Sequence, residues 1–595
     1  MGFQTVPEVL LHRVSATPNN TAYSYPAGSG WKTVSWKEFG EQVKQIAMGL
    51  KALGLTPEQR VAILAGTRYE WIACDMGILC AAGATTTIYP SSLAEDCSYI
   101  VSDSDSVFAF AENDEQVKKL MSVKAQMPGL KKVIVIDGKA SGDGFVITLQ
   151  ELQELGKPSS QADYEATAKQ AKNDGIATLI YTSGTTGKPK GVILTHDCWV
   201  YEGEGINEMK LLVPEDVQFL WLPLAHSFGK VLEVAQIVIG FHTAVDGRVD
   251  KLVENLGQVK PTFVAAVPRI FEKVYNKVVE GTKKTGGLKW SIFKWSIEVG
   301  KEVSKLRQAG QEPSGLLAMK NGVAQKLVFS KLQERFGGRL RYFVSGSAPL
   351  SREMAEFFHA CNILILEGYG LTESSAASFV NRPTGFKFGT VGPPLPGTTL
   401  KIESDGEILI KGRGIMRGYH NKPEETAATL KDGWLYTGDI GELDEAGRLK
   451  ITDRKKDLIK TSGGKYCAPQ NLENALKTSP IVSNSMVHGD MRPYLTVLIA
   501  VNEETAKKLL AEKGVTVGSV AELVKRPEII AEVKSAIDAV NATQPPYSTM
   551  KKFHLVPQDF SQETGELTPT LKVKRKVVTA RYKAALDALY EGAKD

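Results

Sequence analysis

The sequence predicts an α/β fold, in which a large N-terminal domain of parallel-rich sheets with helices is followed by a small C-terminal α+β domain. Short runs of Val, Ile and Leu recur along the chain, each followed by Gly, Ser or Pro and then by a helical pattern. Buried strands that alternate with helices are typical of parallel sheets. The length of 595 residues also exceeds what one hydrophobic core usually holds. The clearest strand-like runs lie at 61–66, 263–268, 342–346 and 363–366.

The middle of the chain departs from this alternation in two places. Residues 281–335 are rich in lysine and contain Trp290 and Trp295 at wide helical spacing, which predicts a helical, amphipathic insert. We interpret both tryptophans as packing within the insert, with a membrane anchor as the alternative. Residues 385–453 combine Gly and Pro turns with short alternating segments, and this texture predicts a β-rich subdomain.

A domain boundary is expected after residue 453. The run 453–457 is polar and dense in charge, as segments between domains often are. We therefore divide the chain into an N-terminal domain, residues 1–453, and a C-terminal domain, residues 454–595. The second domain lies at the lower end of the usual size range.

Composition excludes several classes of protein. Charged residues make up 23% and hydrophobic residues 43% of the chain, which is ordinary globular usage and excludes a disordered chain or a coiled-coil rod. The net charge of +5 is small for this length and argues against a nucleic-acid partner. Six cysteines without a C-x-x-C pair suggest neither a zinc site nor a disulfide framework, and they favour a reducing compartment.

The ends and the apolar segments predict a cytoplasmic protein. The N-terminus lacks a basic region followed by an apolar one, so we expect no signal peptide. No stretch reaches the roughly 20 apolar residues that span a bilayer. Peripheral contact with a membrane and an oligomeric state both remain compatible with the sequence.

The most distinctive segment is the glycine-rich run at 181–191. It lies between two strand-like runs, 176–180 and 192–195, and combines three glycines, four aliphatic hydroxyls and two lysines. Glycines let backbone N–H groups converge, hydroxyls donate to phosphate oxygens, and lysine adds a positive charge. It differs from a Walker A loop, because its glycines are too close together and a proline follows the first lysine. The alternative is a flexible polar hairpin.

Two further segments carry groups that suit a nucleotide. In the run 367–373, which follows a buried strand, Glu373 can hold Mg²⁺ through a carboxylate oxygen and Tyr369 offers a face for a base. In the run 436–439, which ends a strand-like segment, Asp439 can bind ribose hydroxyls. Taken alone, Glu373 would be a surface acid and the Thr-Gly-Asp sequence a turn.

These segments, in this order, resemble the adenylate-forming superfamily, which includes acyl-CoA synthetases, firefly luciferase and the adenylation domains of peptide synthetases. The runs 221–229, 453–460 and 567–575 look like the family's fourth core motif, hinge motif and C-terminal lysine motif. The resemblance extends from about residue 20 to about residue 580. Many members have Ser-Gly before the terminal lysine, where this chain has Thr570 and Leu571.

That departure and the insert favour the long-chain fatty acid–CoA ligase branch. Long-chain acyl-CoA synthetases commonly carry Leu-Thr-Pro-Thr at this place, as residues 567–570 do here. The run 267–275 and the helical insert after it look like long-chain and bubblegum-type synthetases. The resemblance implies two steps: a fatty carboxylate and ATP give acyl-adenylate and pyrophosphate, and coenzyme A then gives acyl-CoA and AMP. Magnesium ion is implied with ATP, and the C-terminal domain is expected to be mobile between the steps.

The resemblance also assigns roles to residues. Four residues receive catalytic roles. Lys572 is implied to bridge the α-phosphate and the carboxylate, and Thr372 to contact the α-phosphate. Glu373 is implied to bind Mg²⁺, and His226 to lie beside the acyl carboxylate. Lys456 is the implied hinge. The segment implied to bind the β,γ-phosphates comprises Thr182, Ser183, Gly184, Thr185, Thr186, Gly187 and Lys190. The remaining nucleotide contacts are Ser347, Ala348, Glu367, Gly368 and Tyr369 around adenine, and Asp439 and Arg454 at the ribose. Coenzyme A is implied to bind Ser462, Gly463, Gly464 and Lys465.

Alternatives remain open from the residues alone. His226 could be a packed core histidine. Lys572 lies in a basic stretch that could be a solvated face or a patch for anionic lipid. The nearest functional alternative is a ligase of the same superfamily that uses another carboxylic acid or a carrier-protein thiol. A non-catalytic nucleotide sensor would be expected to lack Glu373 or Lys572, and this chain has both. A serine hydrolase is disfavoured because no Gly-x-Ser-x-Gly motif occurs.

Overall fold

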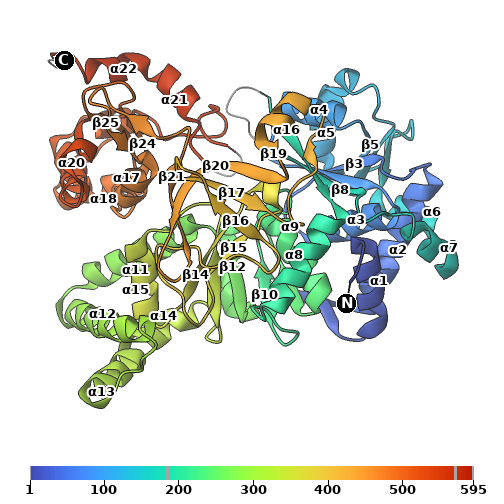
Figure 1. Ribbon diagram of the computed structural model, residues 1–595, viewed down its shortest axis with the longest axis horizontal. Helices are drawn as coiled ribbons and strands as arrows, with labels where there is room; N and C mark the ends of the chain where they lie inside the picture. Colours follow the sequence, from blue (N-terminus) through green and yellow to red (C-terminus); the bar gives the residue numbers. More distant parts are fainter. Residues whose placement is uncertain (1, 183–187, 569–571, 593–595) are drawn as a thin grey trace.

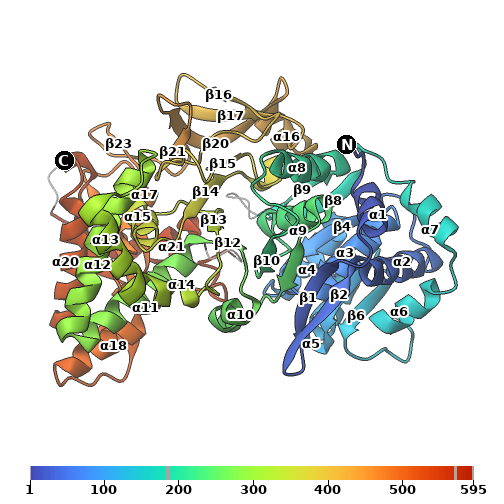
Figure 2. The same ribbon diagram turned by 90° about the horizontal axis from the view of Figure 1, so that it is seen from below.

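The computed structural model describes residues 2–182, 188–568 and 572–592 and has the predicted α/β architecture. Two large mixed sheets and their helices form the N-terminal part, and a smaller antiparallel sheet lies beside them (Figure 1). A third unit, made from the last part of the chain, lies on one side of the molecule (Figures 1 and 2). The segment 183–187, where five of the predicted phosphate-binding residues fall, and residues 569–571 lie outside the described residues.

The first large sheet contains the glycine-rich hairpin. Parallel pairing runs from β8 through β4, β3, β5 and β6 to β7, and the antiparallel strands β9 and β18 complete one edge. The two strand-like runs that flank the hairpin are therefore confirmed as neighbouring strands. In sheet order the strands are β18 (Gly418–Tyr419), β9 (Lys190–Thr195), β8 (Ile176–Thr182), β4 (Ala84–Ile88), β3 (Arg60–Leu64), β5 (Ser106–Asn113), β6 (Lys132–Asp137) and β7 (Val146–Thr148).

The second large sheet carries most of the remaining motifs. Its six central strands are parallel, and an antiparallel strand closes each edge. In sheet order they are β15 (Phe379–Val380), β14 (Ile365–Tyr369), β13 (Tyr342–Ser345), β12 (Phe263–Ala266), β10 (Val217–Leu220), β11 (His242–Val245), β1 (Thr21–Ala27) and β2 (Gly30–Ser35). Ligands of parallel sheets bind where strands end, and β13 and β14 end beside the cavity described below.

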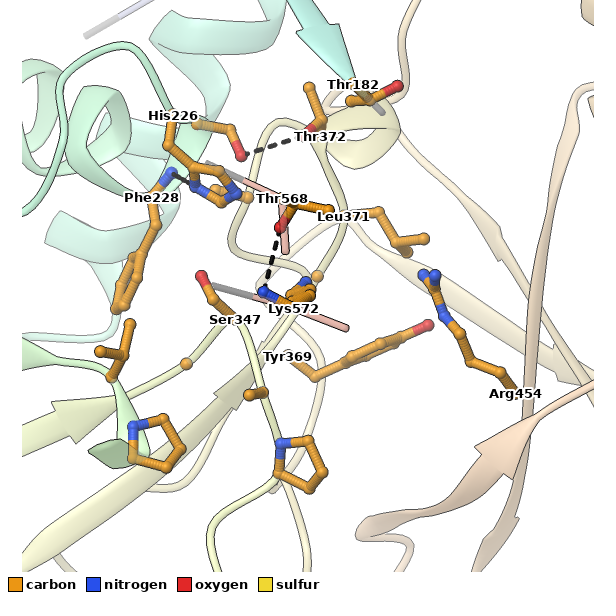
Figure 3. Close-up of a pocket in the computed structure, with 18 of the residues that line it drawn as sticks. Thr182, His226, Phe228, Ser347, Tyr369, Leu371, Thr372, Arg454, Thr568 and Lys572 are labelled. Atoms are coloured by element: carbon orange, nitrogen blue, oxygen red, sulfur yellow. Dashed lines mark hydrogen bonds between the residues drawn. The ribbon is translucent and has the colours of Figure 1, made fainter. Parts of the chain in front are cut away.

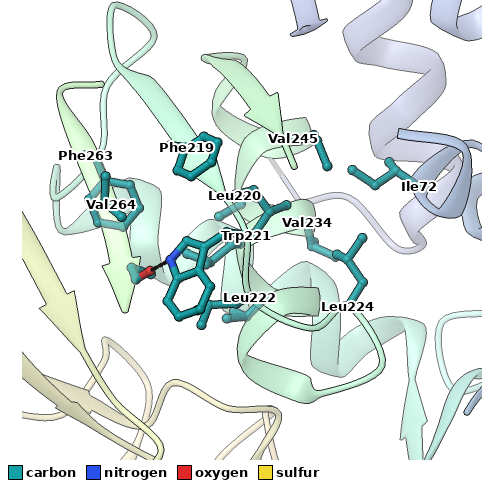
Figure 4. Close-up of a cluster of buried hydrophobic side chains, with 14 of the residues drawn as sticks. Ile72, Phe219, Leu220, Trp221, Leu222, Leu224, Val234, Val245, Phe263 and Val264 are labelled. Carbon is teal, nitrogen blue, oxygen red and sulfur yellow. Dashed lines mark hydrogen bonds between the residues drawn. The ribbon is translucent and has the colours of Figure 1, made fainter. Parts of the chain in front are cut away.

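Buried helices join the two sheets. Apart from Glu70, every residue of α3 (Tyr69–Cys80) is buried, and α9 (Ser227–Ile239) is nearly as enclosed and packs on α8 (His196–Glu208). Figure 4 shows part of the shared core, in which the indole N–H of Trp221 donates to the carbonyl of Ala265 at 2.9 Å. Helices enclosed on all sides belong to the core of a large domain, and their few buried charged side chains pair with one another. The other helices before the insert are α1 (Val6–Ala16), α2 (Trp36–Ala52), α4 (Ala94–Asp103), α5 (Asp114–Ser122), α6 (Leu149–Gly156), α7 (Gln161–Ala168) and α10 (Leu252–Val259).

The insert is helical, as predicted. Helix α11 (Pro268–Thr285) leads into it, with proline at its first turn, where the missing N–H is harmless. Trp290 stacks on Phe293, so it packs within the insert, whereas Trp295 is 38% exposed. The helices that follow are α12 (Gly287–Gln308), α13 (Gly315–Ala324), a π-helical turn (Gln325–Phe329), α14 (Ser330–Glu334) and α15 (Arg352–Ala360).

The β-rich subdomain is an antiparallel sheet with α16 (Pro423–Thr429) beside it. Its strands are β16 (Thr399–Ile402), β17 (Glu407–Lys411), β19 (Leu430–Lys431), β20 (Trp434–Leu443) and β21 (Leu449–Arg454). Two local expectations were wrong. Asp439 lies inside β20 rather than at the end of a strand, because the pairing with β21 continues to Leu443, and Glu367–Tyr369 belong to β14 rather than following it.

The last part of the chain has a hydrophobic core of its own. Buried residues that include Ile459, Leu476, Val497 and Val533 form one cluster around a three-stranded sheet. The strands are β24 (Val482–His488), β25 (Leu495–Val501) and β26 (Met550–Leu555), and two short strands, β22 (Ile459–Lys460) and β23 (Tyr466–Cys467), precede them. The helices are α17 (Pro469–Leu476), α18 (Glu503–Glu512), α19 (Val520–Leu523), α20 (Pro527–Asn541), α21 (Arg575–Arg581) and α22 (Lys583–Ala588).

Candidate active site

A cavity of about 3040 Å³ lies where the two large sheets, the β-rich subdomain and the C-terminal unit meet. Strand ends of the parallel sheets open into it, as expected for ligand sites in α/β folds. Figure 3 shows part of this cavity with side chains from all these units. It brings together most of the predicted site residues within the described part of the chain: Thr182, Lys190, His226, Ser347, Ala348, Glu367, Gly368, Tyr369, Thr372, Glu373, Asp439, Arg454, Lys456 and Lys572.

The glycine-rich hairpin presents its two ends to the cavity. Thr182 and Lys190 are directly paired across β8 and β9, so residues 183–189 connect them. The Lys190 ammonium lies 4.9 Å from the ring centroid of Tyr419, and the Tyr419 hydroxyl donates to Glu373 at 2.8 Å. A lysine, a hydroxyl and a carboxylate are therefore grouped in one corner. Such a group suits a polyphosphate with a bound cation, since phosphate and carboxylate oxygens are the ligands Mg²⁺ prefers.

A hydrogen-bonded triad forms the opposite side. The Tyr369 hydroxyl donates to Asp439 at 2.7 Å, and the Arg454 guanidinium donates to the other oxygen of Asp439 at 2.9 Å. Asp439 and Arg454 are facing residues of β20 and β21, so the sheet register sets this pair. Charge-assisted bonds of this kind hold planar groups in defined orientations. The arrangement leaves the ring of Tyr369 and the guanidinium facing the cavity (Figure 3).

The turn after β14 depends on a close backbone approach at Gly370. A β-carbon at this position would lie 1.9 Å from the carbonyl oxygen of Ala376, so only glycine fits. This approach brings Thr372 and Glu373 to the cavity in a short 3₁₀ turn. Thr372 is buried, and its hydroxyl lies 3.5 Å from that of Ser227 at the start of α9.

His226 is a neutral hydrogen-bond donor to the cavity. It caps the N-terminus of α9, where its Nδ1 accepts a hydrogen bond from the Phe228 backbone N–H at 3.1 Å. Burial, together with the positive charge of Lys572, lowers the pKa of His226 to about 3. The ring is therefore uncharged at neutral pH, and because Nδ1 accepts, its proton sits on Nε2. It can donate to a ligand oxygen but cannot contribute a positive charge.

Lys572 supplies that charge. Two hydrogen bonds join it to Thr568: the backbone N–H of Lys572 donates to the Thr568 hydroxyl at 3.0 Å, and the Lys572 carbonyl accepts from the Thr568 N–H at 2.8 Å. The side chain is open to the cavity but lies deep inside the molecule, close to the charges of Arg454, Asp439 and Glu373. Poor solvation and the Arg454 charge lower the pKa of Lys572 to about 8. Figure 3 shows His226, Thr372 and Lys572 around the same space.

The predicted coenzyme A segment lies elsewhere. Ser462, Gly463, Gly464 and Lys465 form an exposed turn between β22 and β23 and are absent from the residues that line the cavity. The orientation of the C-terminal unit explains this difference. Lys572 and the segment 462–465 belong to the same unit, and in this orientation only Lys572 lines the cavity. Lys456, at the junction, is exposed at the cavity edge.

Two features of the site escaped the sequence analysis. Tyr419, which contacts both Lys190 and Glu373, lies on a two-residue strand with no local pattern that would single it out. The second feature is an apolar part of the cavity lining, which we call the apolar lobe. Its lining comes from α8, β10, α9, β12 and the loops beside them and includes Met209, Leu211, Leu212, Trp221, Leu222, Leu224, Leu232 and Phe263. The lobe joins segments far apart in sequence, so only the fold reveals it.

Comparison with known families agrees with this geometry. A family model described as AMP-binding enzyme matches residues 10–420, and one described as AMP-binding enzyme C-terminal domain matches residues 456–594. The chain belongs to the AMP-binding enzyme family. Family membership accounts for a site built for an adenine nucleotide, as the resemblance stated above predicts.

Curated relatives cover almost all of this AMP-binding enzyme. It is 36% identical to the long-chain-fatty-acid–CoA ligase FadD15 of Mycobacterium bovis, over 96% of this chain and 95% of that protein. It is 33% identical to the long-chain-fatty-acid–CoA ligase ACSBG2 of Xenopus laevis, over 99% of this chain and 85% of that protein. The alignments therefore include both the N-terminal and the C-terminal units.

Solved structures share the fold of this AMP-binding enzyme. ATP-bound MatB from Rhodopseudomonas palustris has a TM-score of 0.68 at 22% identity, covering 98% of this chain and 99% of that one. The A-PCP didomain of carboxylic acid reductase from Segniliparus rugosus has a TM-score of 0.75 at 21% identity, covering 99% and 82%. Within the described residues, no helix combines the length and apolarity needed to cross a membrane.

Proposed function

We propose that this AMP-binding enzyme is an ATP-dependent long-chain fatty acid–CoA ligase. The observation that carries the proposal is that the residues of the apolar lobe and the charged residues Lys572, Glu373 and Arg454 line one cavity. A carboxylate that enters through the lobe would reach the nucleotide beside the lysine. The full-length match to proteins named long-chain-fatty-acid–CoA ligase supports this reading.

In the first step, a carboxylate oxygen attacks the α-phosphorus of ATP, the bond to the β-phosphate breaks, and pyrophosphate leaves. The two reactants are both anions, so a positive charge between them lowers the barrier. Lys572 provides that charge, and His226 Nε2 and the Thr372 hydroxyl donate to oxygens without changing the net charge. No protein nucleophile is needed, and catalysis rests on position and charge.

The nucleotide would be held at its two ends. The triad of Tyr369, Asp439 and Arg454 suits the adenosine, with the ring as a stacking face and the carboxylate as acceptor for ribose hydroxyls. Lys190 and the glycine-rich hairpin suit the β,γ-phosphates. Glu373 would hold Mg²⁺ through a carboxylate oxygen, with phosphate oxygens and water as the other ligands. The ion would neutralise part of the phosphate charge.

In the second step, the sulfur of coenzyme A attacks the acyl carbon, and AMP leaves. This step is proposed to use the segment 462–465, which lies away from the cavity in the present arrangement. A rotation of residues 454–595 about Lys456 would exchange Lys572 for that segment. Two observations support the boundary: the C-terminal unit has a separate core, and the second family model begins at residue 456.

A panel of acids tests the substrate class. We expect thioester yield with ATP and coenzyme A to be greatest for saturated acids of about twelve carbons or more, since each buried CH₂ contributes about 0.8 kcal/mol. Yields for acetate, octanoate, laurate, palmitate, oleate and benzoate are measured under identical conditions. A maximum at acetate or benzoate would show that the lobe binds another acid, which is the nearest alternative. Replacement of Met209 by tryptophan should shift the optimum to shorter chains, and Met121→Trp, on the exposed side of α5, serves as the control.

A further inference from the structure

The helical insert is the basic part of this chain. Residues 281–335 contain eleven Lys and Arg against four Asp and Glu, a formal charge of +7, whereas the whole chain has 72 against 67 and a charge of +5. The remaining residues therefore sum to −2. One segment therefore carries a net positive charge larger than that of the whole protein, and such a concentration of charge produces a local electrostatic field.

Helix α13 and the turn after it expose an apolar stripe. Leu316, Met319, Val323 and Leu327 are 66%, 71%, 49% and 43% exposed. Their spacing of three, four and four residues places them along one side of a helix. Other positions of the same segment supply the packing of the insert, because Ala324 and Phe329 are buried. The stripe is therefore not needed for the fold, and exposed apolar rows of this kind mark interaction surfaces.

Lysines border the stripe and the neighbouring helix. Lys320 and Lys326 lie beside it, and Lys289 and Lys294 are exposed on α12, where Leu288 and Trp295 are exposed as well. Within the described part of the chain, none of these four lysines forms an ion pair. Figure 1 shows α13 at the lower tip of the molecule, beyond the body of the protein. The described residues of the chain leave these side chains exposed.

We propose that the insert docks on an anionic lipid bilayer, with the stripe 316–327 inserted at the interface and the lysines at headgroup level. A helix with an apolar row and lysines on both sides has the pattern of helices that lie in the membrane plane. The charge favours an anionic occupant over a second copy of the chain, because two inserts of formal charge +7 would repel each other. The proposal concerns binding and does not depend on which acid the enzyme activates.

The basic C-terminal stretch fits this role less well. Arg575 forms an ion pair with Glu473 at 2.7 Å, Arg581 lies 3.4 Å from Glu566, and Lys583 pairs with Asp587. Their charges are largely balanced inside the C-terminal unit. The insert, with a formal charge of +7, therefore offers more unbalanced positive charge to anionic lipid than these three residues do.

Docking through the insert would bring the cavity near the lipid. Helix α11 packs on α12, and its first turns contribute Arg269 and Lys273 to the cavity lining. An apolar substrate dissolved in the bilayer would then have a short path to the enzyme.

Co-sedimentation of the purified full chain with vesicles tests the proposal. Vesicles contain phosphatidylcholine alone or with about one-third phosphatidylglycerol. We expect the protein to bind the anionic vesicles. Binding should weaken at high salt, because salt screens exposed charges. The triple variant L316E, M319E, V323E should bind at least about tenfold more weakly than the parent. The matched control is L155E, V253E, I530E, which makes the same charge change at exposed apolar residues on α6, α10 and α20.

The outcomes are separable. Both triple variants alter only exposed side chains, so circular dichroism and thermal unfolding should match the parent and show that loss of binding is not loss of fold. The proposal is overturned if the parent ignores anionic vesicles, if the two triple variants bind equally, or if neutral and anionic vesicles are bound alike. It is also overturned if size-exclusion chromatography shows that L316E, M319E, V323E instead dissociates a dimer.

Discussion

Replacing Lys572 by alanine is expected to reduce fatty-acid-dependent ATP–pyrophosphate exchange by about 10²–10³-fold, the usual effect of removing one group that stabilises developing charge. Lys572 faces the cavity close to the charges of Glu373, Asp439 and Arg454. His226 cannot replace it, because its pKa of about 3 leaves it neutral. Thioester formation from preformed acyl-adenylate and coenzyme A should change by much less, since that step is proposed to use another arrangement of the C-terminal unit.

The pH dependence gives a second readout for the same residue. Because the pKa of Lys572 is lowered to about 8, the lysine is charged below this pH and neutral above it. The adenylation kcat/KM, which reports free enzyme, should therefore fall as pH rises through about 8. Lys572→Arg should remove this alkaline limb, because arginine stays charged. Lys551→Ala, at an exposed lysine on β26, is the control and should leave both readouts unchanged. Equal losses in both half-reactions, or an unshifted limb in the arginine variant, would contradict the assigned role.

Replacing Lys230 by methionine is expected to lower the free energy of unfolding by about 3–5 kcal/mol, because it leaves a buried carboxylate without its cation. Lys230 on α9 contacts Asp75 on α3 and lies 3.3 Å from Glu233, and all three side chains are completely buried. Burial raises the pKa of Glu233 well above its usual value, which favours its neutral form. The variant removes the cation and leaves both buried acids without it.

The triple variant K230M, D75N, E233Q separates lost charge from lost packing. We expect it to recover most of the stability, since a buried ion pair can be replaced by neutral groups of similar size at little cost. Chemical and thermal unfolding of all variants, followed by fluorescence, gives the comparison. A single variant as stable as the parent, or a triple variant less stable than the single one, would contradict this account of the cluster.

Local patterns predicted much of this molecule. Apolar runs identified the strands on both sides of the glycine-rich hairpin, and the motif order identified the family. The roles of Tyr369, Asp439 and Arg454 came from that resemblance, and the fold then joined the three in one hydrogen-bonded triad. Strand ends were harder to predict, because β20 continues past Asp439 only through pairing with β21.

Tertiary contacts decided the rest. Lys230 meets Asp75 across 155 positions of sequence, and nothing near either residue predicts the pair. Tyr419 joins the site through a strand of two residues. The segment 462–465 shows a different limit: a motif can predict which residues serve a step, but the position of a whole unit decides whether they reach the site.

The central claim is that this chain uses ATP to activate a fatty carboxylate at Lys572, and isotope exchange tests it most directly. The wild-type protein is incubated with ATP, Mg²⁺ and labelled pyrophosphate, without coenzyme A, and palmitate is added or withheld. The account predicts that label enters ATP only when both the fatty acid and Mg²⁺ are present. Absence of exchange with every chain length, or exchange that proceeds equally without any acid, would contradict it.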